Sequence, residues 1–444
     1  MRRSLLFLAL VVLVACGKVK SDNCASAADC ADPANPLCAP DGACVGCVGA
    51  TDCSGDTPIC DTGARACRGC GADPECTGGV CIEAEGACVA DADVAFVADL
   101  GDDTGECTRA APCGTFPAAA ATTRRVIHVL GGTLRPATTT TFVNNDHVLD
   151  GEDTAIEVGQ QTAFDVQGPA KLTIEGFRLT VPPGTATPPV PAVKVAGVGA
   201  VAVIHDVEFA SNGGSAVLSD SSADVTIRAS HIGTLTSQNP TEVDCNNAKL
   251  HLDQSVLETA FATAGTECEA TITRNRFESS RDRSVQWAGG LLVMENNLII
   301  HRDGFNDSIS FFALRPGSTV RFNTIVNTTA LPSDGAALNC DGSAQVTSNI
   351  FAYNSGHPIT GTGCVTRFST FDDVATTSAG TGNQVTGIET IFVNRGAGDY
   401  HLTATSIARG GAEPGLTMVK VDIEGNPRPA PEGSTADCGA FEAP

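Results

Sequence analysis

Ile227-Arg-Ala-Ser230-His-Ile232 sets a pattern, apolar-x-x-polar-x-apolar, that the chain repeats many times. The pattern recurs with starts at Ile174, Ile204, Leu252, Ile272, Val293, Val320 and Val346. Successive starts are about 25 residues apart, and the first two copies carry an apolar residue in the fourth slot. A period between 20 and 50 residues is typical of solenoids, in which each repeat stacks on its neighbours.

A repeat of this length, holding two or three short strands, matches one coil of a β-solenoid. We therefore predict an all-β fold, a right-handed parallel β-helix (a single-stranded solenoid) over residues 126–395. Parallel strands of successive coils would lie about 4.8 Å apart, with the first and last slots stacked into an apolar core. Less regular coils are expected to begin near Ile127 and His147.

The fourth slot predicts a second kind of stacking. An Asn at a sharp turn can hydrogen-bond the same Asn one coil away and satisfy turn backbone. The alternative for these residues is glycosylation or ligand binding. The predicted ladder consists of Ser230, Ser255, Asn275, Asn296, Asn323 and Asn349.

Cysteine spacing in the solenoid agrees with the same period. Cys245 and Cys268 are 23 residues apart, and Cys340 and Cys364 are 24 apart, so each pair could bridge neighbouring coils. Cys438 is left without a partner.

Residues 24–88 form a different region, with twelve cysteines in 65 positions. They make three units of four cysteines that open at Cys24, Cys47 and Cys70. A unit of about 20 residues has too little apolar surface for a core and needs cross-links. Two disulfides per unit are expected, with connectivity left open. The alternative is a zinc site with the ligand set Cys44, Cys47, Cys67 and Cys70.

The N-terminal residues have the pattern of an export signal. Arg2 and Arg3 precede an apolar run from Leu5 to Val14, and Leu13-Val14-Ala15-Cys16 has the pattern of a bacterial lipobox. We predict a signal peptide over residues 1–15, lipidation of Cys16 and a tether over 16–23. An Asp directly after the lipidated Cys commonly retains a lipoprotein at the inner membrane, and this chain has Gly17 there. We therefore predict that the protein is anchored to the outer membrane, on the side of the cell surface or of the periplasm.

Residues 89–125 are expected to be an acidic linker and an entry cap to the β-helix, closed by a Cys107–Cys113 loop. Its carboxylates leave Ca²⁺ open as a ligand, but no EF-hand spacing supports it. No other cofactor is indicated. Residues 396–444 are expected to form a C-terminal cap.

The net charge of the chain makes some classes of binding partner unfavourable. The chain carries a net charge of −24, which would repel nucleic acids and anionic lipid headgroups. The predicted partners are the membrane, through the lipid anchor, and an extracellular polysaccharide or surface protein. The oligomeric state is not indicated.

Several segments resemble bacterial lipoproteins that join short Cys-rich repeats to a pectin-lyase-like parallel β-helix. Residues 102–116 resemble the entry segment of that family. Residues 399–411, 422–429 and 437–442 resemble its closing motifs, except that Cys438 replaces an aliphatic residue. The resemblance implies the fold, whereas the polygalacturonase residue set is absent.

One group of stacked polar residues could form a catalytic site. The second slot of successive coils holds Glu175, His205, Arg228 and Asp253. The fifth slot holds Arg178, Glu208 and His231. Stacked side by side, they could perform acid–base work on a sugar acid, or simply stabilise a solvent-facing sheet. We favour a non-catalytic surface lipoprotein that binds a glycan or protein, or has a structural role. The alternative is a lyase or hydrolase acting on uronic-acid-containing polysaccharides.

Overall fold

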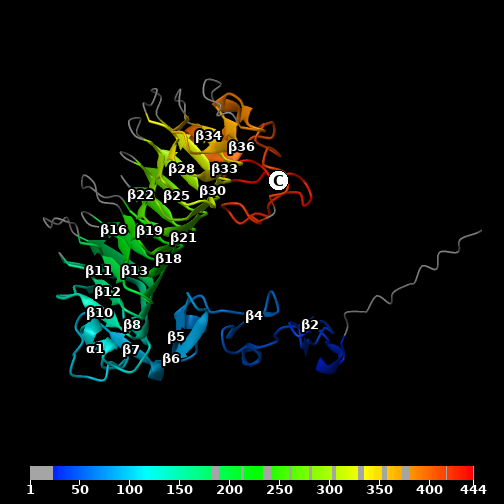
Figure 1. The fold of residues 1–444 in the computed structure, drawn as a ribbon. Helices are drawn as coiled ribbons and strands as arrows, with labels where there is room; N and C mark the ends of the chain where they lie inside the picture. Colours follow the sequence, from blue (N-terminus) through cyan, green and yellow to red (C-terminus); the bar gives the residue numbers. More distant parts are fainter. Residues whose placement is uncertain are drawn as a thin grey trace, which may run out of the picture. The chain divides into compact units, whose positions relative to one another are not determined.

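In the computed structural model the chain folds into two compact units (Figure 1). The N-terminal unit ends at Cys88 and the second unit begins at Val89. The described residues are 24–159, 161–181, 190–211, 215–233, 242–259, 263–279, 283–302, 307–328, 335–352, 358–372, 380–416 and 418–443. The predicted signal peptide and Cys16 therefore lie outside the described residues.

The N-terminal unit contains three copies of one small motif, a 3-10 turn followed by an antiparallel hairpin. The turns are η1 (Ala27–Asp29), η2 (Ala50–Asp52) and η3 (Asp73–Glu75). The hairpins are β1 (Leu37–Cys38) with β2 (Cys44–Val45), β3 (Ile59–Asp61) with β4 (Ala66–Arg68), and β5 (Gly79–Ile82) with β6 (Ala87–Ala90).

Each of these motifs holds two disulfides, as predicted, and the structure supplies their connectivity. The first cysteine of a motif pairs with the third, and the second pairs with the fourth. The bonds are Cys24–Cys38, Cys30–Cys44, Cys47–Cys60, Cys53–Cys67, Cys70–Cys81 and Cys76–Cys88. All four cysteines of the alternative zinc set are therefore disulfide-bonded, which removes the thiolates that zinc would need.

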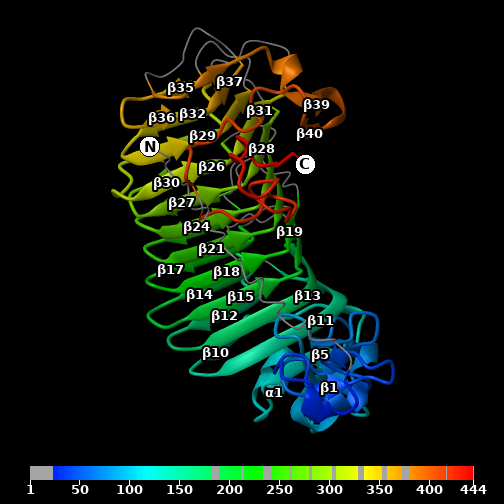
Figure 2. The same cartoon turned by 90° about the vertical axis from the view of Figure 1, so that its right-hand side faces the viewer.

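The second unit is a parallel β-solenoid, as the repeat predicts, and Figure 2 shows its coils stacked along one axis. Each regular coil contributes one strand to each of three sheets. The first sheet contains β7 (Val94–Val97), β8 (Val126–Val129), β11 (Asp146–Glu157), β13 (Lys171–Val181), β15 (Val201–His205), β18 (Asp224–Arg228), β21 (Lys249–Asp253), β24 (Glu269–Thr273), β27 (Leu292–Glu295), β30 (Ser318–Arg321), β33 (Ala344–Thr347) and β36 (Val365–Arg367).

The second sheet follows the first after a short turn, and β11 and β13 run through both sheets. Its other strands are β9 (Thr133–Leu134), β16 (Glu208–Ser211), β19 (His231–Ile232), β22 (Val256–Thr259), β25 (Arg276–Ser279), β28 (Leu298–His301), β31 (Thr324–Asn327), β34 (Ile350–Ala352), β37 (Thr370–Phe371) and β38 (Gln384–Val385).

The third sheet has ten strands. They are β10 (Thr140–Val143), β12 (Phe164–Gln167), β14 (Val193–Ala196), β17 (Val217–Asp220), β20 (Val243–Asn246), β23 (Thr263–Thr266), β26 (Val285–Ala288), β29 (Ile309–Phe312), β32 (Leu338–Asp341) and β35 (Ile359–Thr360).

The core consists of inward side chains stacked in rows. Ile204, Ile227 and Leu252 are register partners in the first sheet, and all three are fully buried. In the third sheet the single tryptophan, Trp287, stacks over Gly265. A Cβ on Gly265 would lie 2.3 Å from the indole, so only glycine fits there.

The polar ladder exists at the turn between the first and second sheets. Asn275 donates from Nδ2 to Oδ1 of Asn297 at 3.0 Å, and Asn297 donates in the same way to Asn323 at 2.9 Å. Each of these Oδ1 atoms also accepts the backbone N–H of the preceding ladder residue. Described ladder members are Ser230, Ser255, Asn275, Asn297, Asn323, Asn349, Ser369 and Asn383.

The prediction of Asn296 as a ladder residue is wrong, because Asn297 occupies that slot. Met294, not Val293, is the register partner of Ile272 in the core, so this coil begins one residue later than the pattern predicts. Asn296 is the left-handed turn residue, with φ of 54°, and its Nδ2 donates to the carbonyl of Val421 at 2.7 Å.

The remaining predicted disulfides are present as Cys107–Cys113, Cys245–Cys268 and Cys340–Cys364. The last two connect a strand of the third sheet to the next coil. Cys438 has a buried free thiol, whose Sγ lies 3.2 Å from the carbonyl of Phe368. Burial raises the pKa of the Cys438 thiol to about 12, so it stays protonated and unreactive.

The two ends of the solenoid are closed by irregular segments. At the start, η4 (Asp91–Asp93) leads into β7, which already pairs with β8 in parallel, so the first sheet begins before residue 126. Helix α1 (Phe116–Ala120) follows, and Asp103 accepts the N–H groups of Gly114 and Thr115 just before it. In the described part of the chain, no helix has the length and apolarity needed to cross a bilayer.

The C-terminal cap lies over the outer face of the second sheet. It begins with η6 (Ile388–Thr390), β39 (Phe392–Asn394), η7 (Arg395–Ala397) and β40 (Asp399–Leu402). Leu298, Val326 and Ile350 of the sheet pack with Tyr400 and Phe441 of the cap. Arg428 lies over the ring of Phe322 at 4.4 Å and donates to backbone carbonyls of residues 437 and 439.

Candidate functional site

The four candidates of the second slot form one continuous row on the outer side of the first sheet. Glu175 is the register partner of His205, His205 of Arg228, and Arg228 of Asp253. The same row extends upstream to Asp150 and His128, whose Nδ1 lies 2.6 Å from Asp150 Oδ2. These two residues were missed, although each follows an aliphatic residue in the less regular first coils.

Titration in this row is governed by burial and by neighbouring charge. Burial lowers the pKa of His205, and the positive charge of Arg228 lowers it further. Nδ1 of His205 has no hydrogen-bond partner among the described residues. His205 is therefore neutral at pH 7, the form in which an imidazole can act as a base.

The two carboxylates predicted for this row, Glu175 and Asp253, are too far apart to form an acid–base pair. Three register steps separate Glu175 from Asp253, which places their backbones about 14 Å apart at the usual strand spacing. Glycoside hydrolases use carboxyl groups about 5–9.5 Å apart. Asp253 is also engaged, because it accepts from Thr273 Oγ1 at 2.7 Å and from Arg274 Nε at 3.0 Å.

The fifth-slot residues lie on the outer face of the second sheet, again in register. Arg178 is the register partner of Glu208, and Glu208 is the register partner of His231 in the parallel sheet. The Arg178 guanidinium lies 3.4 Å from Glu208, and His231 lies 3.6 Å from Glu258. A cavity of about 470 Å³ opens over this face. Its lining is Asp153, Phe177, Arg178, Asp206, Val207, Glu208, Ala229, Ser230, His231, Gln254 and Val256.

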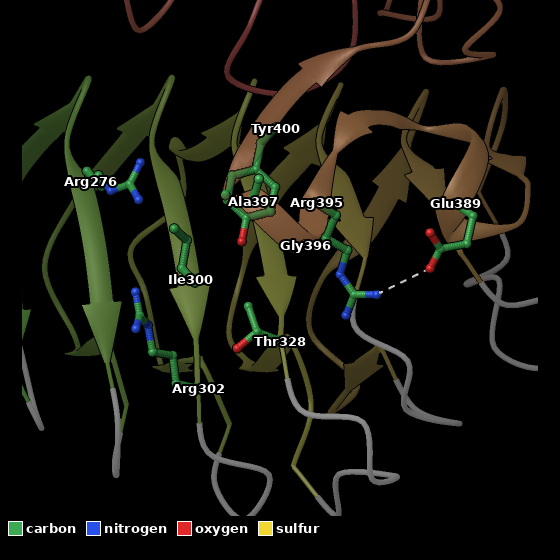
Figure 3. A pocket seen from close by; sticks show the side chains of 10 residues that line it. Arg276, Ile300, Arg302, Thr328, Glu389, Arg395, Gly396, Ala397 and Tyr400 are labelled. Atoms are coloured by element: carbon green, nitrogen blue, oxygen red, sulfur yellow. Dashed lines mark ion pairs between the residues drawn. The ribbon is translucent and has the colours of Figure 1, made fainter.

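A larger cavity, of about 710 Å³, lies farther along the same face, where the C-terminal cap meets the sheet (Figure 3). The sheet contributes Arg276, Ile300, Arg302 and Thr328, and the cap contributes Glu389, Arg395, Gly396, Ala397, Gly398 and Tyr400. We call this space the arginine cavity. Sequence reasoning missed it, because its walls come from segments about 100 residues apart.

Packing of the cap places the wall residues of the arginine cavity. Tyr400 stacks edge-on against Phe392 with ring centroids 5.5 Å apart, and burial raises the pKa of its phenol. Arg395 donates to the carbonyl of Asn327 at the end of β31. The ring contact holds the two strands of the cap hairpin together, and the Arg395 bond joins that hairpin to the sheet, so the cavity is preformed.

The two cavities adjoin in the strand register. Val256 lines the smaller cavity, Arg276 lines the arginine cavity, and the two residues are register partners in β22 and β25. None of Glu175, His205, Arg228 and Asp253 lines either one. We refer to the outer face of the second sheet, from Arg178 to Arg302, as the binding face.

No family model matches this chain, and no curated protein matches it. Among solved structures it is similar to one described as "Crystal structure of pectate lyase Pel9A". The identity is 12%, the match covers 79% of this chain and 96% of that one, and the TM-score is 0.35.

Proposed function

We propose that this chain is an outer-membrane lipoprotein whose solenoid binds an extracellular glycan without chemically converting it. The observation that carries the proposal is the binding face, where two preformed cavities adjoin along one sheet. Ligand sites are usually concave and largely preformed. An extended polymer lying parallel to the solenoid axis would contact both cavities.

The composition of the binding face favours a glycan over a protein partner. Charged side chains of both signs lie on it, including Arg178, Glu208, Glu258 and Arg276. Such groups offer donors and acceptors to sugar hydroxyls, whereas the centre of a protein interface is depleted of charge.

A glycan array probed with the purified full chain tests this proposal. We expect binding to one or more polysaccharides, with affinity reduced at least tenfold by Arg178→Gln combined with His231→Ala. Glu157→Gln is a matched surface control. Glu157 is the last residue of the earlier strand β11, and its carboxylate pairs with Arg135. Absence of binding to every glycan, or capture of protein partners only, would contradict the proposal.

Catalysis on uronic-acid polymers is the alternative, and the row of His205 and Arg228 is where it would occur. The half-buried neutral His205 beside a guanidinium is the specific observation in its favour. Incubation with pectin and alginate, with detection of unsaturated ends, distinguishes the two functions. Product formation that disappears in the His205→Ala plus Arg228→Ala variant would establish the enzyme; on our proposal no product forms.

Membrane anchoring through Cys16 has its own test. The apolar run and lipobox motivate it, and lipid attachment requires the Cys16 thiol. Cys16→Ser should accumulate as unprocessed precursor and lose its lipid label. Normal maturation of this variant would refute the anchor without bearing on glycan binding.

A further inference from the structure

The arginine cavity differs in charge from the chain around it. Three guanidinium groups line it, from Arg276, Arg302 and Arg395, in a chain of net charge −24. Among the described residues, two carboxylates pair with them, Glu278 and Glu389. Glu389 is 84% exposed and lies 3.9 Å from Arg395, so water and salt screen that pair. Among the described residues, local positive charge therefore exceeds local negative charge.

Glu278 holds two of the arginines in place without using up their donors. Nε of Arg276 donates to Oε1 of Glu278 at 2.6 Å, and Arg302 donates to Oε2 of the same carboxylate. Each guanidinium has five N–H donors, so one shared carboxylate leaves most of them available. Side chains fixed in this way bind a ligand with little loss of conformational entropy.

The remaining lining suits a sugar ring. Figure 3 shows Ile300 and Thr328 between the two sheet arginines and Arg395, with Tyr400 above them. Gly396, Ala397 and Gly398 form an adjoining wall without long side chains, where a ligand can approach the backbone. The volume of about 710 Å³ lies within the range of small-molecule sites and can hold more than one sugar unit.

We infer that the arginine cavity is an oxyanion site, and that the ligand of the binding face is therefore an acidic glycan. Its carboxylate or sulfate groups would lie between Arg276, Arg302 and Arg395. Guanidinium forks recognise both groups by paired, charge-assisted hydrogen bonds. This inference rests on the proposed function and names its ligand class.

Titration calorimetry on the full chain with three matched probes tests the inference. The probes are cellotetraose, its C6-oxidised glucuronate form and its C6-sulfated form. We expect at least one charged form to bind at least tenfold more tightly than the neutral form, and to weaken as NaCl is raised. The charged probe that binds identifies the oxyanion as carboxylate or sulfate.

Variants then locate the site. Arg276→Gln combined with Arg302→Gln should weaken the charged probe at least tenfold, and Arg395→Gln tests the opposite wall without disturbing Glu278. Arg178→Gln, a residue of the smaller cavity, should retain the preference for charged over neutral probe. Intrinsic fluorescence of Trp287 reports whether each variant is folded.

Three results would overturn the inference: equal affinity for neutral and charged probes, no binding of any probe, or charged-probe binding unchanged by all the arginine-cavity variants. These results are separable from failure of the proposed function. If the array finds only neutral glycans, the binding module stands and the oxyanion site falls. If the array finds none, both fall.

Discussion

The N-terminal unit and the solenoid reach a folded state by opposite means. The N-terminal unit has strands of two to four residues and six disulfides within residues 24–88. The solenoid, with many more residues, has three disulfides among its described residues and long rows of buried aliphatic side chains. Cross-links replace a core where the segment is too short to bury one.

Exposed carboxyl groups of the N-terminal unit and a buried one of the solenoid have pKa values shifted in opposite directions. In the N-terminal unit, backbone N–H groups hold the pKa of Asp29 and Asp52 below the usual range, and Arg68 with a backbone N–H lowers that of Glu75 to about 2. In the solenoid, burial raises the pKa of Glu242 to about 9. Exposed loops stabilise charge, whereas a dry stack penalises it.

The largest effect is expected from removing one cross-link in each region. Cys53→Ala with Cys67→Ala should cost about 3 kcal/mol, enough to unfold the second hairpin motif locally. Cys245→Ala with Cys268→Ala should lower the stability of the solenoid while leaving it folded. Hydrogen exchange read by mass spectrometry gives protection in both regions. Full protection of residues 47–67 in the first variant would break the comparison.

The next effect concerns pH and acts on the two regions in opposite directions. The pKa of Glu242 is higher in the folded than in the unfolded state. Its contribution to the stability of the solenoid is therefore highest below about pH 4.5 and falls as pH rises toward 9. Glu242→Gln should therefore stabilise the solenoid at pH 7 by about 3 kcal/mol. Urea unfolding followed by Trp287 fluorescence measures this.

Glu258→Gln, at an exposed position on the same solenoid, is the matched control and should not reproduce this gain in stability. The N-terminal unit should respond in the reverse sense. Stability from Glu75, whose folded pKa is depressed to about 2, is present above pH 4.5 and lost as pH falls through 2. A solenoid whose stability is equal at pH 5 and pH 8 would refute the role given to Glu242.

A smaller effect separates the ladder from its neighbour. Asn323→Ala leaves the buried N–H of Asn297 without its acceptor and should cost about 2 kcal/mol in urea unfolding. Asn296→Gly keeps the left-handed backbone accessible, removes the bond to Val421 and should cost about 1 kcal/mol or less. The reverse order of the two costs would restore Asn296 to the ladder.

The smallest effect is expected on the binding face. Arg178 and Glu208 are 57% and 42% exposed, so Arg178→Gln should change stability by less than about 0.5 kcal/mol. A loss of more than 1 kcal/mol in unfolding free energy in the same urea assay would mean that this ion pair stabilises the sheet. Stacked surface charges would then contribute to the stability of the solenoid in addition to its core.

Much of the fold could be read from the chain because a solenoid repeats its constraints. Each coil places an aliphatic residue in the same inward slot, so Ile204, Ile227 and Leu252 report the period independently. The limit of this reasoning appears at Asn296 and Asn297. Two adjacent asparagines carry the same local signal, and only strand register decides which one points inward.

The candidate site was predictable only in part. The second-slot row of Glu175, His205, Arg228 and Asp253 follows from the period, and the register places them together. The arginine cavity does not follow, because Arg276 and Arg302 belong to the repeat while Arg395 belongs to the cap. No spacing rule connects a repeat to the segment that folds back on it.

The sequence by itself determined the stacked solenoid, the cross-linked N-terminal region and the cysteine pairs one coil apart, since periodic apolar and cysteine positions act locally. Tertiary structure alone decided the connectivity within residues 24–88, the inward asparagine at 297 and the cavity between sheet and cap. These depend on which atoms meet across long separations, and packing fixes that choice only once the chain is folded.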